Sequence, residues 1–403
     1  MLYKLSFLCL NLFVAASFFS PTLRFVFLVP GLLFWILAIL FFEKSRARLV
    51  LKSFLSPFCL IFLFFVLVNF FLKAFYEEGF VVAIKSLFSS YLQWFWIIFF
   101  LEFYSNGDEL KISPIKILSY TTSVFASVLS LIIILQFLGL IPFAGNHLGI
   151  LSQPFTSSGI LLCALFINLS LLPNDFSFYR PGQTLSGIGF WLLGLSALQI
   201  IAILFLGQLS SWFGLVLGLL VFIVSTKFFS KRQILFIILV PLALLSLAYN
   251  VSPRIKTKID RLSSIQRLLE NKSIQCRFEI WKINYLLWLE KPILGLKKIM
   301  PYDCVLSPLK PPTRMTHAHN IYLQNLFHGG LVRFTAWIIF YLTLLFNLLK
   351  SRSTWALPFL CGFLALSLEG FFENWWGDSE VLTLFFLMML IFNNKPTSAS
   401  LKS

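Results

Sequence analysis

Charged side chains are scarce in this sequence: 12% of the 403 residues are Asp, Glu, Lys or Arg, whereas 59% are hydrophobic. About a quarter of the residues in a soluble domain are charged, so these proportions exclude an ordinary soluble enzyme and predict an integral membrane protein. Acids are scarcer than bases, at 16 against 32. The bases lie in short runs between apolar segments and no nucleic-acid-binding motif is found, so we expect no nucleic-acid partner.

Several motifs of soluble enzymes and metal sites are also missing. The sequence has no phosphate-binding Gly-rich loop followed by Lys-Ser/Thr, no dinucleotide fingerprint and no HExxH. Its six cysteines contain no CxxC pair, which argues against a metal–thiolate site. Cys276 and Cys304 share one polar segment. In an oxidising compartment they could form a disulfide, and otherwise they are two free thiols.

Apolar runs long enough to cross the hydrocarbon core of a membrane predict the fold class. The first run has no small-residue cleavage site after it and a second follows almost at once, so it is interpreted as a retained helix rather than a signal peptide. We expect an all-α integral membrane protein with about twelve transmembrane helices. They lie near residues 5–20, 24–42, 54–72, 87–104, 115–140, 156–172, 186–206, 211–227, 232–250, 331–349, 355–372 and 378–393.

The expected organisation has four parts. Residues 1–250 hold transmembrane helices one to nine, 251–330 form one long loop, 331–393 hold helices ten to twelve, and 394–403 are a cytoplasmic tail. The connections assigned to the cytoplasm and the two tails together carry fifteen Lys and Arg residues. The short connections on the outer side of the membrane carry two. Lys and Arg resist translocation, so the long loop is predicted on the outer face. Its own basic character suits a site that handles anions.

Two stretches of the long loop have helical spacing of apolar residues. These are 259–270 and 277–289, and the second places Arg277, Trp281 and Trp288 along one stripe. Basic helices that carry Trp suit the membrane–water interface. An aromatic stripe more often packs than forms a site, so we expect these Trp side chains to pack the loop against the bundle.

The densest group of candidate functional residues is 313–330, TRMTHAHNIYLQNLFHGG. An HxH pair such as His317 and His319 can chelate zinc, but a zinc site needs further ligands and the loop has few carboxylates, so no metal is expected. His328, like His147, is interpreted as a hydrogen-bonded loop residue. The role of His317 is left open.

This segment resembles the signature of the O-antigen ligase and O-antigen polymerase superfamily of bacterial membrane glycosyltransferases. The resemblance rests on a His followed by Asn, about ten residues before a Gly that opens a span, here His319, Asn320 and Gly330. Upstream, the family's Arg-x-x-x-Trp and Pro-x-x-Gly elements are matched by Arg277, Trp281, Pro292 and Gly295.

The sequence departs from the family pattern at two positions. Arg333 stands where the family has a second Gly, and Leu209 stands where it has a second functional Arg, just before a Trp that is matched by Trp212. Another base would then have to supply the missing charge, and Arg254, Arg261 and Arg314 are the candidates.

The resemblance implies a GT-C-like fold in the bacterial inner membrane, with short interfacial helices in a periplasmic loop and the active site facing the periplasm. It implies transfer of a glycan from undecaprenyl pyrophosphate to an acceptor hydroxyl, with inversion at the anomeric carbon. For a ligase the acceptor would be lipid A–core. The reaction would take place in contact with membrane lipids and would need no cofactor or metal. His319 would be the base, and Arg277 would bind pyrophosphate together with Arg254, Arg261 or Arg314. Supporting residues would be Trp281, Asn320, Gly330 and His317.

Three alternatives remain. An O-antigen repeat-unit polymerase or a protein O-oligosaccharyltransferase would share the same motifs and differ in the acceptor. A transporter or flippase of lipid-linked sugar is disfavoured because mid-span positions are almost wholly apolar. A metal-dependent glycosyltransferase would use carboxylates of the outer face, for which the candidates are Glu77, Glu78, Glu369, Glu373, Asp378 and Glu380.

Overall fold

The computed structural model describes the chain in segments. They are residues 2–42, 57–87, 114–142, 154–176, 187–225, 239, 242–243, 245–262, 264–305, 312–350, 356–374 and 379–393. The predicted span near 87–104, most of the one near 232–250 and the tail 394–403 lie outside the described residues. So do His147 and Asp378.

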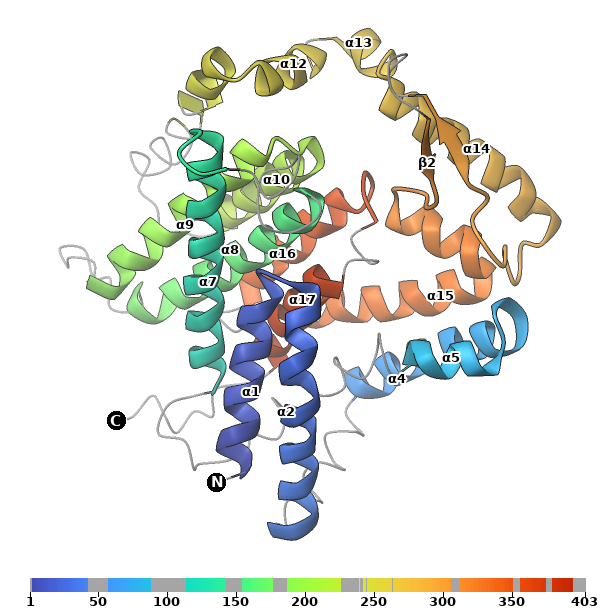
Figure 1. The fold of residues 1–403 in the computed structure, drawn as a ribbon, viewed down its shortest axis with the longest axis horizontal. Coiled ribbons are helices and arrows are strands. Elements are labelled where there is room, and N and C mark those ends of the chain that lie inside the picture. Colours follow the sequence, from blue (N-terminus) through green and yellow to red (C-terminus); the bar gives the residue numbers. More distant parts are fainter. Residues whose placement is uncertain are drawn as a thin grey trace.

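Helices make up almost all of the regular structure, as predicted for an all-α protein (Figure 1). The helices that coincide with predicted spans are α1 (Leu2–Ser17), α2 (Pro21–Phe42), α4 (Pro57–Phe71), α7 (Pro114–Phe137), α8 (Pro154–Phe176), α9 (Gly187–Leu206), α10 (Leu209–Ser225), α15 (Ile321–Lys350), α16 (Ala356–Glu369) and α17 (Ser379–Asn393). A π-helix, η1 (Leu72–Glu77), continues α4, and α5 (Phe80–Ser86) follows.

Five segments of the described residues are long and apolar enough to cross a membrane. They are Leu60–Glu77, Ile117–Phe137, Pro154–Leu171, Gly189–Leu206 and Ile321–Lys350. Shorter apolar helices at Lys4–Ser17, Leu23–Leu37, Leu209–Ser225 and Ala356–Glu369 add to them. This pattern supports a multi-pass membrane protein.

Helix α8 is the centre of the bundle. Helices α7, α9, α16 and α17 pack around it, and its side chains from Ile160 to Ile167 are fully buried. Its Asn168 amide donates to Leu192 O at 2.9 Å and to Ser196 Oγ at 2.7 Å, and its oxygen accepts from Ser123 Oγ at 3.0 Å. Polar groups inside a membrane bundle need such partners, so this network ties α7, α8 and α9 together.

The polar segment after the ninth predicted span folds at one end of the bundle, opposite the end where α1 begins (Figure 1). It comprises α12 (Pro253–Leu262), α13 (Ile265–Leu269), α14 (Lys272–Glu290), and the antiparallel strands β1 (Tyr302–Cys304) and β2 (Thr313–Met315). Short helices were predicted here, and α14 contains the expected stretch 277–289.

The single helix predicted over 259–270 is wrong, because α12 ends at Leu262 and α13 starts at Ile265. The Ser264 hydroxyl accepts a hydrogen bond from Arg267 N at 3.1 Å. A serine oxygen that satisfies a free N–H at a helix start favours a new helix over continuation of the old one. Helix α14 begins in the same way, with the Asn271 side chain accepting from Ser273 N at 3.0 Å.

A small second core holds the polar segment together. Cys276 on α14 is disulfide-bonded to Cys304 on β1, which settles the alternative left open by the sequence. Ile280, Ile299 and Met315 are buried around the bond, and Trp281 and Trp288 pack against them. Both Trp side chains therefore pack, but in the core of the polar segment itself rather than against the helix bundle as predicted.

Replacing both Cys276 and Cys304 with serine should lower the stability of this segment by about 3–4 kcal/mol, because the disulfide closes a loop with a sequence separation of 28. The expected result is a lower thermal unfolding temperature in detergent and faster proteolysis within the segment. Replacing Cys9, which is a free cysteine, is the matched control. Equal unfolding temperatures of the double variant and the control would contradict this role of the disulfide.

Candidate active site

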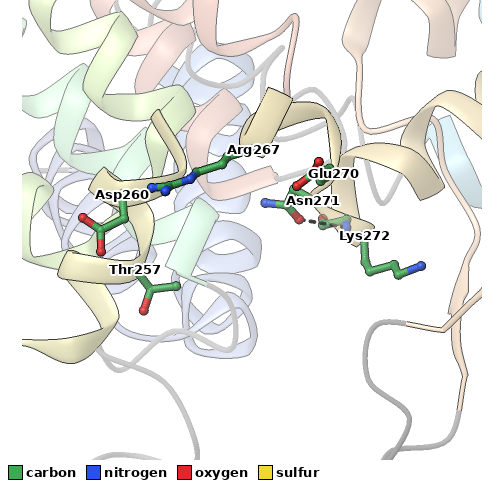
Figure 2. Close-up of a pocket in the computed structure, with 7 residues that line it drawn as sticks. Thr257, Asp260, Arg267, Glu270, Asn271 and Lys272 are labelled. Atoms are coloured by element: carbon green, nitrogen blue, oxygen red, sulfur yellow. Dashed lines mark hydrogen bonds between the residues drawn. The ribbon is translucent and has the colours of Figure 1, made fainter. Parts of the chain in front are cut away.

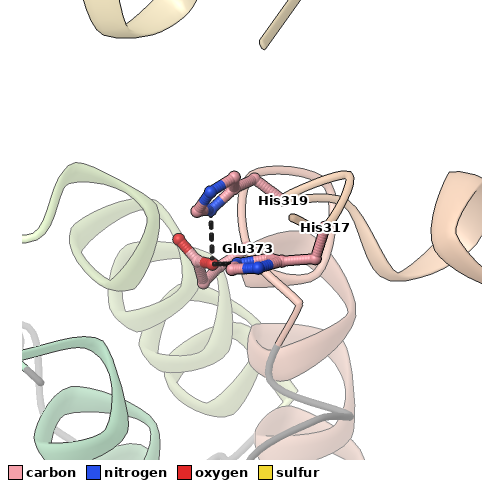
Figure 3. Close-up of side chains that lie close together, drawn as sticks. All are labelled: His317, His319 and Glu373. Carbon is pink, nitrogen blue, oxygen red and sulfur yellow. Dashed lines mark hydrogen bonds and ion pairs between the residues drawn. The ribbon is translucent and has the colours of Figure 1, made fainter. Parts of the chain in front are cut away.

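Three segments that are far apart in the sequence meet at the buried carboxylate of Glu373, and Figure 3 shows two of them, the loop of His317 and His319 and the turn of Glu373. His319 Nδ1 lies 2.9 Å from Glu373 Oε1, and His317 Nε2 lies 3.8 Å from the same oxygen. Arg277 Nη2 lies 3.4 Å from Oε2 on the other side of the carboxylate. The predicted base and the predicted pyrophosphate ligand therefore share one acidic partner.

Two hydrogen bonds attach α14 to the site, one from Trp281 and one from Arg277, which lie one helical turn apart. The Trp281 indole N–H donates to Ala318 O, which fixes the loop of His317 and His319 against the helix. Arg277 Nη1 donates to Phe372 O, while its Nε is buried and has no hydrogen-bond partner among the described residues. A guanidinium carries five N–H donors, so Arg277 retains donors for an anionic ligand.

Asn320 positions His319 at the start of α15. Its Oδ1 accepts from Tyr322 N and Leu323 N at 2.9 Å, as an N-cap does, and its Nδ2 donates to Phe371 O at 3.0 Å. His319 itself has φ 48°, in the left-handed region that non-glycine residues seldom adopt. The helix start and the turn after α16 are thus joined directly, which brings His319 to Glu373.

The surroundings of the three side chains set their charges. Burial would raise the pKa of Glu373, but the neighbouring imidazoles of His317 and His319 and the charge of Arg277 lower it to about 2. Burial lowers the pKa of His319, with Glu373 opposing that shift. Burial also lowers the pKa of Arg277, against the attraction of Glu373. At neutral pH the site therefore holds an ionised Glu373 and a neutral His319.

Ionised Glu373 determines which nitrogen of His319 carries the proton. A carboxylate only accepts hydrogen bonds, so Nδ1 must be the protonated nitrogen and Nε2 carries the lone pair. No described residue is hydrogen-bonded to Nε2. The arrangement can therefore take up a proton at Nε2 while Glu373 stabilises the resulting cation.

A break inside α15 separates the site from the long apolar helix. Gly330 has φ 59° and ψ −162°, and Leu331 N donates to Pro292 O at 2.9 Å. Leu296 N donates to Phe327 O at 2.7 Å from the same turn. The Pro-x-x-Gly element thus packs directly on the break. Residues 321–329 form a short helix, and the long apolar part of α15 begins at Leu331.

Residues 194–338 match the family model described as O-antigen ligase, a range shorter than half of the chain. The chain carries an O-antigen ligase family domain. The resemblance predicted from the motifs is therefore confirmed. A search of curated proteins finds no match.

The O-antigen ligase domain contains Arg277 and His319 but ends before Glu373. Together with the apolar helices, it indicates a multi-pass membrane protein of the O-antigen ligase and polymerase type of glycosyltransferase. Such a family has a lipid-linked glycan and an acceptor as its general partners.

Arg333, which stands at a glycine position of the O-antigen ligase pattern, is held by an acid of η1. Its Nη1 lies 3.6 Å from Glu77 Oε1 and contacts His328 Nδ1. His328 Nε2 donates to Lys297 O at 3.1 Å, so the predicted hydrogen bond is present, but His328 lies in α15 and not in a loop. Glu78 lies 3.9 Å from Lys73. Both acids of this pair thus face bases, and neither joins the cluster at Glu373.

Leu209, where the O-antigen ligase pattern has an Arg, is the first residue of α10. The base that reaches this turn is Lys258, whose Nζ donates to Gly207 O and which is not among the bases predicted from the sequence. Arg314 is exposed on β2, opposite Asp303. Arg254 and Arg261 lie on α12, and their side chains are outside the described residues. The described contacts bring none of the three nominated arginines to Glu373.

Two other carboxylates were considered as metal ligands, Glu369 and Glu380. Glu369 is buried on α16 and accepts from the Ser211 hydroxyl at 2.5 Å, within the helix bundle. Glu380 lies on α17, and its side chain is outside the described residues. Among the described residues, the one group with metal-ligating geometry is His317, His319 and Glu373, whose ligand atoms lie within 4.8 Å of one another. The sequence analysis had missed Glu373 as the third possible ligand of the HxH pair.

Proposed function

We propose that this protein transfers an O-antigen-type glycan from undecaprenyl pyrophosphate to an acceptor hydroxyl, with lipid A–core as the acceptor. The site would face the periplasm from the bacterial inner membrane, in the polar segment 251–330. The observation that carries the proposal is the convergence of Arg277 and His319 on Glu373. One base and one phosphate ligand are what this transfer requires.

In the proposed reaction, the acceptor hydroxyl oxygen attacks the anomeric carbon of the lipid-linked sugar. The bond from that carbon to the pyrophosphate oxygen breaks, and the hydroxyl proton passes to His319 Nε2. One displacement inverts the anomeric configuration. Glu373 holds His319 in the tautomer that leaves Nε2 free and stabilises the imidazolium once the proton has arrived.

Arg277 has the complementary role at the leaving group. A departing pyrophosphate is already anionic and needs positive charge rather than a proton. The planar guanidinium binds phosphate oxygens through paired N–H groups and stays charged at any physiological pH. The buried, unbonded Nε of Arg277 supports a ligand at this position. Further positive charge for the pyrophosphate would come from other bases of the polar segment, for which Arg254, Arg261, Arg314 and Lys258 are the candidates.

The transfer reaction is tested by reconstituting the purified protein with an undecaprenyl-pyrophosphate-linked glycan and two acceptors offered separately, lipid A–core and a second lipid-linked glycan. Glycan on lipid A–core supports the ligase proposal. Elongated lipid-linked glycan supports the polymerase alternative instead, and glycan on an added acceptor protein supports a protein O-oligosaccharyltransferase. Movement of intact donor across the vesicle membrane without any transfer would support the flippase alternative.

One observation favours a second candidate, a metal-dependent transferase. His317, His319 and Glu373 supply the nitrogen and oxygen donors that divalent transition metals accept. The positive charge of Arg277, 3.4 Å from Glu373, opposes a second cation there. Transfer should therefore persist after exhaustive treatment with a chelator. Activity that is lost with the chelator and restored by Zn²⁺ would establish the metal-dependent reaction in its place.

The rate of transfer should fall on acidification, because protonated His319 cannot accept the hydroxyl proton. Burial lowers the pKa of His319 below its ordinary 6.5, so the loss should occur below pH 6.5 and leave the rate at pH 7 intact. A pH profile of kcat for the wild-type protein measures this. An acid limb above pH 7 would contradict a buried neutral base.

A further inference from the structure

A polar cavity of about 590 Å³ lies where α12, α13 and α14 approach one another (Figure 2). Thr257 and Asp260 line it from α12, Arg267 from α13, and Glu270 and Asn271 from the junction with α14. Figure 2 shows Arg267 extending from α13 towards the helix that carries Asp260, with Asn271 facing the same space. Nothing in the reaction described above uses these side chains.

The lining identifies the class of ligand. Every residue that lines the cavity has a polar side chain, and the apolar part of the lining comes from the carbon atoms of these same residues, a mixture that suits the hydroxyl groups and C–H faces of a sugar. Its two acids, Asp260 and Glu270, are balanced by two bases, Arg267 and Lys272, so it lacks the excess of positive charge that a pyrophosphate site needs. Carboxylates accept hydrogen bonds from hydroxyl groups, and Arg and Asn donate to them. A polyhydroxylated, uncharged ligand fits this set of groups.

Helix α14 connects the cavity to Arg277. Asn271 caps α14, and Ser273, which also lines the cavity, lies four residues before Arg277 on that helix. Residues i and i+4 share one face of an α-helix and are separated by about 6 Å along its axis. The cavity is therefore lined by the turn of α14 that directly precedes Arg277.

We propose that this cavity is a glycan subsite that binds sugar residues of a substrate whose reacting end lies at Arg277 and His319. The inference rests on the proposed glycan transfer. The same polyhydroxylated chemistry occurs in the donor glycan and in the core oligosaccharide of the acceptor. Measuring the binding of the donor glycan and of the core oligosaccharide separately shows which of the two the cavity binds.

The test uses the purified full-length protein and two lipid-free probes in saturation-transfer NMR. The first probe is the glycan released from its lipid carrier by mild acid, and the second is core oligosaccharide. The variant is Arg267→Ala with Glu270→Ala. The matched control is Glu279→Ala with Lys282→Ala, which removes the same two charges from exposed positions on α14 outside the cavity.

Wild-type and control proteins should bind one probe, and the cavity variant should bind it at least roughly tenfold more weakly, the effect of losing one hydrogen bond to a charged group. The probe that responds identifies donor or acceptor. Equal affinity of the cavity variant and the control, or no binding of either probe to the wild type, would overturn the subsite.

Transfer kinetics separate this inference from the proposed reaction. The cavity variant should raise the KM for the substrate that responds in the binding test and leave kcat unchanged, as expected for a lost binding contact away from the reacting atoms. Normal KM values in the variant would refute the subsite while the reaction stands. Cavity-dependent binding in a protein that transfers nothing would refute the reaction while the glycan subsite stands.

Discussion

Replacing His319 with alanine should lower kcat for glycan transfer by a factor of about 10² to 10⁴, the range that general-base catalysis contributes. The reason is that Glu373 holds His319 Nδ1 at 2.9 Å and so leaves the lone pair on Nε2, whereas His317 is more exposed and lies 3.8 Å from the same oxygen. The measurement is single-turnover transfer in proteoliposomes with saturating donor. The variant should keep its affinity for the lipid-linked donor, because Arg277 and the apolar helices are unchanged.

Glu373→Gln tests whether the acid acts through His319. A glutamine amide can donate to Nδ1, which would leave the proton on Nε2 and remove the base. Its loss should approach that of His319→Ala, and the double variant should be no slower than His319→Ala alone, since two residues that act as one unit are not additive. Additive losses would mean that Glu373 has a separate role.

His317→Ala is the matched control on the same loop. His317 lies 3.8 Å from the Glu373 oxygen and is partly exposed, so its removal should cost less than tenfold in kcat if His319 alone is the base. If the two histidines instead hold a metal, both variants should lose activity together. Equal, large losses in His317→Ala and His319→Ala would therefore contradict metal-free base catalysis.

The helical architecture could be predicted from the sequence because lipid-crossing helices need long apolar runs, and these runs stand out in composition alone. Helix ends were less well predicted. The predicted stretch 259–270 has unbroken apolar spacing, yet Ser264 starts a new helix by capping it. A serine within such a pattern permits either outcome, and packing of the surrounding segment decides between them.

About half of the candidate active site could be predicted from the sequence. His319 and Arg277 were found because their motif spacing is local, but their shared partner Glu373 lies 54 and 96 residues away. Contacts at such separations leave no periodic signal in one sequence. A physical signal did exist, since a buried arginine needs a counter-charge and few acids lie near the predicted outer ends of the spans. Glu373 had been considered only as a metal ligand.

Gly330 was predicted to open a span, and the structure gives the physical reason for glycine at this position. Its φ of 59° and ψ of −162° lie in a region that only glycine adopts readily. A Cβ atom there would meet Ile293 O at 2.3 Å and Gly295 N at 2.4 Å. Both contacts are to backbone, which cannot move aside as a flexible side chain can.

Gly330→Ala should therefore destabilise the protein by about 4 kcal/mol or more, because backbone strain and overlap with a second backbone segment act together. The expected result is a large loss of monodisperse protein in size-exclusion chromatography and a lower unfolding temperature in the fraction that remains. Gly295→Ala should behave alike, since its Cβ would lie 2.2 Å from Gly330 N. Gly194→Ala is the matched control, because nothing lies within 4 Å of its added Cβ.

The same substitution should affect function in the fraction that folds. The break at Gly330 lets the short helix 321–329 leave the direction of the long apolar helix, and Asn320 at its start holds His319 against the turn that carries Glu373. A helix forced to continue through residue 330 would draw Asn320 and His319 away from Phe371 and Glu373. Folded Gly330→Ala protein should then bind donor but transfer it slowly. Wild-type stability and transfer in this variant would show that the break is dispensable.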